Sequence, residues 1–181
     1  VGGGTAALAV AHLGSTNMIT FRYRLKDLSM SITEGPFTAA EREFPAGSFL
    51  VTGTPEELDR ARAEAVELGL VAASLSELPE VRTHEGDAPR VAIYSQWQGT
   101  QELGWWRHAF DRFGIPFDLI FKERVALGDL RGEYDVIVMA AQDVARRTVL
   151  AEPARRPWPY QASETYRSLG MYGETPDMSG G

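Results

Sequence analysis

The sequence predicts an α/β protein with a β-rich N-terminal part over residues 1–80, a linker over 81–89, and a second α/β domain over 90–181. Two observations lead to this class. Apolar and polar residues alternate between residues 18 and 32, as they do in a half-exposed antiparallel sheet. After residue 90, short apolar runs alternate with helix-length segments, which is typical of a parallel sheet with crossover connections.

The first predicted element lies in MITFRYRLKDLSMSI, residues 18–32. Ile19, Phe21 and Tyr23 fall on one face, with polar residues between them, and this is the period of a strand. Serines continue the alternation in the second half of the segment. The pattern predicts either one long bent strand or two strands of an antiparallel sheet.

A strand and a helix follow. A turn at Pro45–Gly47 leads into a short buried strand, Phe49–Val51. Thr54 is placed as the N-cap of a helix, Pro55 as its first helical residue, and Glu57 completes a capping box three residues after the cap.

This helix has one apolar stripe, which consists of Leu58, Ala61, Ala65 and Leu68. Gly69 is expected to end the helix in the left-handed conformation. A strand is then predicted at Leu70–Ala73, so the segment is a small strand-helix-strand unit. The polar, Pro- and Gly-containing stretch that follows contains the predicted linker, 81–89.

The second domain is predicted to contain three strands and one long helix. The strands are Arg90–Tyr94, Phe117–Phe121 and Asp135–Ala140, and the helix is Thr100–Phe113, closed by Gly114. The remaining residues are rich in Pro and Gly and have no sustained period. Together with the opening VGGG, this indicates a fragment of a longer polypeptide whose sheet is incomplete.

The predicted helix at 100–113 holds two adjacent tryptophans. At 3.6 residues per turn, one stripe contains Leu103, Trp106, Phe110 and Phe113, so Trp106 is expected in the core. Trp105 points about 100° away from its neighbour and toward Arg112.

Composition excludes several classes of function. The net charge of -7 argues against nucleic acid or an anionic membrane surface as the main partner. The chain has no cysteine, so disulfides, thiolate zinc sites and a cysteine nucleophile are excluded. No apolar run is long enough to span a membrane, and the N-terminus lacks the layout of a signal peptide.

Motifs for catalysis and for metal binding are not found. His12, His84 and His108 lie in unrelated segments, whereas a catalytic zinc needs three convergent protein ligands. His108 and Asp111 share a helix face without a third ligand, which is typical of a solvated surface. The sequence also lacks a Gly-x-Ser-x-Gly elbow and a phosphate-binding loop. We therefore expect no catalytic residue, metal ligand or cofactor in this segment.

A ligand crevice is nevertheless expected where the predicted parallel strands end, because ligands of open α/β sheets bind outside the carboxyl ends of the strands. That edge would present Ser95, Gln96 and Trp97 after the first strand, with Gln142 and Asp143 after the third. These side chains suit a peptide or small-molecule ligand. The alternative is that these five residues are ordinary loop residues with no role in binding.

Four segments, in this order, resemble a known family: HLGSTNMITFRYRLKD, EFPAGSFLV, RVAIYSQWQGTQELGWWRHAFDRFGIPF and LGDLRGEYDVIVM. They are similar to the region downstream of the catalytic domain in large bacterial zinc carboxypeptidases, the carboxypeptidase A-like metallopeptidases. There, a segment resembling class I glutamine amidotransferase domains, with a flavodoxin-like sheet, follows the peptidase domain. The resemblance runs from about His12 to Met139. Leu103 and Ala140–Ala141 depart from the family pattern, in which an acidic residue and a proline stand.

The resemblance implies a parent protein that removes C-terminal residues from peptides with zinc, in the periplasm or outside the cell. The family's His-x-x-Glu zinc motif does not occur in this chain, and the cysteine required for glutamine hydrolysis is absent. The resemblance therefore implies a non-catalytic accessory region that packs on the parent peptidase domain in cis or binds a ligand. The family-like Gly-Trp-x-Arg implies an interface role for Trp105, with Arg112 beside it. An independent α/β module that binds sugar or peptide is the alternative, and catalysis by the segment itself is a third possibility.

Overall fold

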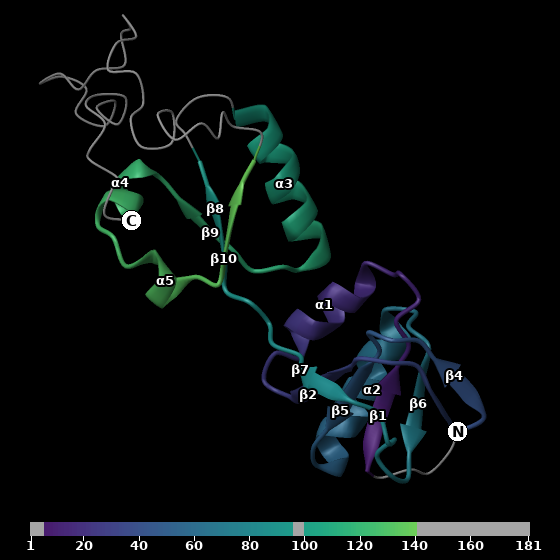
Figure 1. The fold of residues 1–181 in the computed structure, drawn as a ribbon. Helices are drawn as coiled ribbons and strands as arrows, with labels where there is room; N and C mark the ends of the chain where they lie inside the picture. Colours follow the sequence, from purple (N-terminus) through teal and green to yellow (C-terminus); the bar gives the residue numbers. More distant parts are fainter. Residues whose placement is uncertain (1–5, 96–99, 141–181) are drawn as a thin grey trace, which may run out of the picture. The chain divides into compact units, whose positions relative to one another are not determined.

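The computed structural model describes residues 6–95 and 100–140. The chain divides into two compact units, residues 1–88 with 113–115 and residues 89–112 with 116–181. The first contains a five-stranded antiparallel sheet, and the second contains a three-stranded parallel sheet (Figure 1). The α/β class predicted from the sequence is confirmed.

The sheet of the first unit has the order β6-β1-β5-β2-β7. Its strands are β1 (Ala7–Val10), β2 (Ser29–Thr33), β5 (Phe49–Thr52), β6 (Ala72–Leu75) and β7 (Thr83–Glu85). Helix α1 (Asn17–Arg24) connects β1 to β2, and helix α2 (Pro55–Glu67) connects β5 to β6. This β-α-β-β-α-β order, with neighbouring strands antiparallel, is that of the split βαβ, or ferredoxin-like, motif.

Both faces of this sheet are covered. Leu8 and Val10 of β1 belong to the core formed with the two helices, whereas Ala7 and Ala9 point to the opposite face. That face is covered by a hairpin of β3 (Phe37–Ala39) and β4 (Arg42–Phe44). Strand β1 was not predicted, because a strand buried on both faces lacks the alternation of a half-exposed one.

The β3–β4 hairpin closes through a two-residue turn. Ala40 and Glu41 have φ values of 48° and 57°, the positive values that a type I′ turn requires at both central positions. Phe37 and Phe44 stack with their ring centroids 4.8 Å apart, and Phe44 is completely buried. The aromatic pair therefore joins the hairpin to the core.

The strand prediction for residues 18–24 was wrong, because these residues form α1. Met18, Phe21 and Leu25 have helical spacing and are buried at 3%, 0% and 0% exposure, whereas Ile19 is 44% exposed. The burial therefore follows the helical period and not the strand period. The second half of the segment does form a strand, β2.

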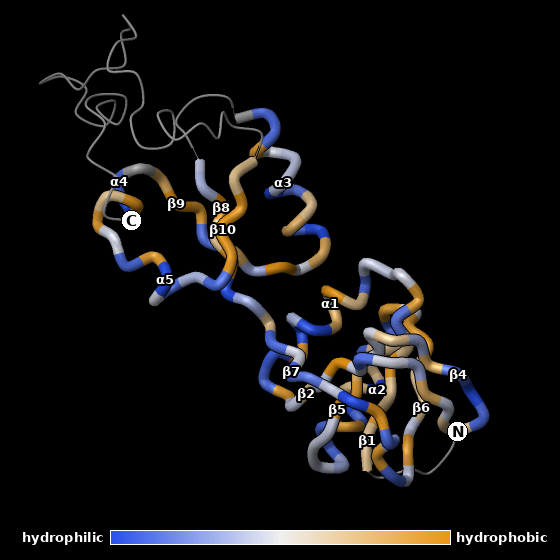
Figure 2. Tube along the Cα trace, in the orientation of Figure 1, coloured by the Kyte–Doolittle hydropathy of each residue, from blue (hydrophilic) through white to orange (hydrophobic). Residues whose placement is uncertain are grey.

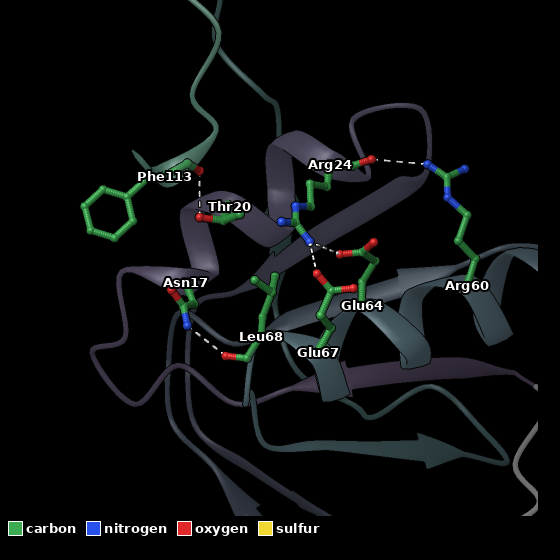
Figure 3. A network of polar contacts seen from close by, with 8 residues as sticks. All are labelled: Asn17, Thr20, Arg24, Arg60, Glu64, Glu67, Leu68 and Phe113. Carbon is green, nitrogen blue, oxygen red and sulfur yellow. Dashed lines mark hydrogen bonds and ion pairs between the residues drawn. The ribbon is translucent and has the colours of Figure 1, made fainter. Parts of the chain in front are cut away.

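Polar contacts fix α1 against α2 (Figure 3). The side-chain amide of Asn17 donates to the carbonyl of Leu68 at 2.8 Å. Arg24 forms ion pairs with Glu64 at 3.0 Å and with Glu67 at 2.7 Å. These contacts lie at both ends of α1 and hold the helix along α2.

Several local predictions for the first unit are confirmed. Gly47 and Gly69 have φ values of 84° and 65°. Thr54 and Glu57 form the capping box, with the Thr54 amide donating to the Glu57 carboxylate at 2.7 Å. Strand β6 begins two residues after the predicted start at Leu70, and β7 lies inside the segment predicted as the linker.

The second unit contains β8 (Val91–Tyr94), β9 (Asp118–Ile120) and β10 (Val136–Met139) in the parallel order β10-β8-β9. These three strands and helix α3 (Thr100–Phe113) were predicted, and their positions are confirmed. Two short helices, α4 (Lys122–Ala126) and α5 (Leu130–Glu133), were not predicted. Figure 1 shows α3 on one side of this sheet, with α4 and α5 on the other.

The expected core position of Trp106 was wrong. Leu103 on α3 is 5% exposed and belongs to the core, but Trp106 is 43% exposed. Its ring meets the edge of Phe110 at 5.8 Å, and Phe110 meets Phe117 at 5.6 Å. The aromatic rings thus pack on one another along the helix, and only part of the predicted stripe is covered by the described strands.

Candidate functional site

The candidate site lies where the strand order of the second unit changes direction. The chain leaves β8, passes through α3 to β9 on one side, and returns through α4 and α5 to β10 on the other side of β8. Successive crossovers in opposite directions place their helices on opposite faces of a parallel sheet. In open sheets of this kind, ligands bind outside the carboxyl ends of the strands at such a reversal, which here is the end of β8 and β10.

Ser95 is the described residue at this position. It follows β8 directly and is 2% exposed, and its backbone amide donates to the carbonyl of Ile120 at 2.8 Å. Ala140 follows β10, is 2% exposed, and comes next in the register that pairs Tyr94 with Met139. The two loops of the predicted crevice thus begin side by side. The other predicted residues, Gln96, Trp97, Gln142 and Asp143, lie outside the described residues.

An ion pair fixes β8 and β10 at their amino ends. Arg90 donates to the Asp135 carboxylate from Nε at 3.0 Å and from Nη2 at 2.8 Å, and to the carbonyl of Gly132 at 2.7 Å. These hydrogen bonds lower the pKa of Asp135 from 3.8 to about 2. The pair joins β8 to β10 at the ends opposite to the predicted crevice.

This pair was missed from the sequence. A possible signal is that Arg90 and Asp135 each stand directly before an apolar strand. That signal becomes informative only when the two strands are known to be neighbours.

The outer face of α3 presents the predicted interface residues. Trp105 is 67% exposed, and its ring meets the edge of His108 at a centroid distance of 6.3 Å. Arg112 is also exposed. The spacings of three and seven residues place Trp105, His108 and Arg112 on one stripe of the helix. The stripe combines an aromatic ring with a guanidinium group, a composition enriched in protein–protein interfaces.

A cavity of about 490 Å³ lies beside β9 in the same unit. It is lined by Asp118, Leu119, Ile120, Phe121, Glu123, Arg124, Glu133 and Tyr134. The Tyr134 hydroxyl donates to Asp118 at 3.1 Å, and Arg124 pairs with Glu133 at 2.6 Å. Burial and the neighbouring Asp118 carboxylate raise the pKa of Tyr134.

This cavity was not predicted, because its residues come from a strand and two short helices that show no common motif. Two pairs of its polar side chains, Tyr134 with Asp118 and Arg124 with Glu133, are already bound to each other. A polar ligand would have to replace those contacts, so the cavity is a weaker candidate than the crevice.

Within residues 6–95 and 100–140, no group of three or more acidic or histidine side chains could hold a metal ion. In the same residues, no helix combines the length and the apolar character that crossing a bilayer requires. Comparisons with models of protein families, with curated proteins and with solved structures find no match to this chain.

Proposed function

We propose that this region is a non-catalytic accessory region of a bacterial zinc carboxypeptidase, attached in cis to the peptidase domain. Zinc and the catalytic residues would belong to that domain, and the parent protein would act in the periplasm or outside the cell. The resemblance of the four sequence segments supports this proposal.

We also propose that the second unit is the beginning of a flavodoxin-like, class I glutamine amidotransferase-like sheet. In chain order, β8, β9 and β10 are its first, second and third strands, and they are arranged 2-1-3. The flavodoxin-like order is 2-1-3-4-5. The agreement over three strands supports the flavodoxin-like sheet expected from the sequence.

The exposed Trp105 is the observation that carries the accessory role. Tryptophan is highly buried on average, yet this ring is 67% exposed on a regular helix. Tryptophan and arginine are also the residues most enriched among those that dominate binding energy. The stripe of Trp105, His108 and Arg112 is therefore proposed as the surface that packs on the peptidase domain.

The reading frame upstream of Val1 provides the first test. The proposal expects a His-x-x-Glu motif and a later histidine, because a catalytic zinc needs three protein ligands. A signal peptide placed directly before Val1 would contradict it and would favour an independent binding module.

The second test is binding of this chain to the separately produced peptidase domain, measured by calorimetry. Trp105→Ala should weaken binding by about 2 kcal/mol or more, as expected for a central interface tryptophan. The control is Leu127→Ala, which removes a side chain that is 80% exposed outside α3. Equal binding by Trp105→Ala and the unsubstituted chain would refute the proposed interface.

A ligand site at the carboxyl ends of β8 and β10 is proposed as the second candidate function, and the reversal of strand order at β8 supports it. Helix α3 follows the β8 loop, so its positive N-terminal end faces this region and would favour a carboxylate of a peptide. A short alanine peptide should shift the NMR resonance of the Ser95 amide, whereas its amidated form should bind more weakly. No shift with either peptide would contradict this site.

A further inference from the structure

We draw no further inference here: the strongest candidate, the cavity of about 490 Å³ beside β9, is lined in part by two pairs of polar side chains that already bind each other, and nothing in the described residues indicates a ligand for it.

Discussion

Three alanine substitutions on α3 should rank the contributions of its apolar side chains to stability. Leu103 is 5% exposed, so Leu103→Ala should cost about 2–5 kcal/mol of unfolding free energy. A fully buried tryptophan would cost about 3–5 kcal/mol. Trp106 is 43% exposed, so its replacement should cost about 2 kcal/mol. Trp105→Ala should stay within about 0.5 kcal/mol of the unsubstituted chain, as expected for a surface position.

The assay can separate the two units. The four tryptophans are residues 97, 105, 106 and 158, and all four belong to the second unit. Tryptophan fluorescence during urea denaturation therefore reports on the second unit, whereas far-UV circular dichroism detects both. A change on α3 should shift the fluorescence midpoint. The control Val66→Ala, at a residue of the first unit that is 75% exposed, should leave it unchanged.

The expected order is Leu103, then Trp106, then Trp105, from the largest loss of stability to the smallest. A loss from Trp106→Ala equal to or greater than the loss from Leu103→Ala would refute the reasoning. It would mean that Trp106 is a core residue, as its position on the helical stripe predicted.

Three further predictions concern a turn, a helix cap and an ion pair. Glu41 has a φ of 57°, so Glu41→Gly should relieve about 1 kcal/mol of backbone strain, and the greater freedom of glycine in the unfolded chain should offset part of this gain. The thermal unfolding temperature should therefore rise. A lower unfolding temperature would contradict the turn conformation. Thr54→Ala removes the capping box and should lower the free energy of unfolding by about 1 kcal/mol, as measured by urea denaturation with circular dichroism. An unchanged free energy would mean that the cap does not contribute to stability. The pKa of Asp135 is lowered from 3.8 to about 2, so its pair with Arg90 stabilises the folded state above pH 3.8, and this stabilisation is lost as the pH falls toward 2. Asp135→Asn should make the urea midpoint that tryptophan fluorescence measures less dependent on pH in that range. An unchanged pH dependence would contradict the assignment of this stabilisation to the pair of Asp135 with Arg90.

The elements of the second unit could be predicted because local signals mark their ends. Gly114 has a φ of 64° and ends α3, and Pro116 and Asp118 mark the start of β9. The spatial order of the strands had no local signal. The sequence does not show that β8 lies between β9 and β10, and the pairing of Arg90 with Asp135 spans 45 positions. The strands and the helix of this unit were therefore predictable, whereas the contacts between its strands were not.

Residues 18–24 were wrongly predicted as a strand because the strand period and the helical period both fit some of their apolar residues. Phe21 and Leu25 are four positions apart, a spacing that places them on one face of a strand and also on one face of a helix. Met18 and Ile19 distinguish the two, since a helix buries Met18 and a strand of this register buries Ile19. The connection between β1 and β2, which α1 supplies, would have decided the question, but β1 itself was not recognised.

The apolar content of a strand in this protein also indicates whether the strand has a neighbouring strand on each side. Strand β1 is apolar throughout, lies between two strands and is buried on both faces. Strand β7, Thr83–Glu85, is polar, all three of its residues are exposed, and it lies at an edge of the described sheet. In both strands the composition matches the position, because unpaired edges with apolar side chains promote association. Strand β10 is apolar throughout like β1 (Figure 2), but among the described strands it pairs with β8 alone. The same physical rule that explains the first two strands therefore predicts that a further strand pairs with the other side of β10.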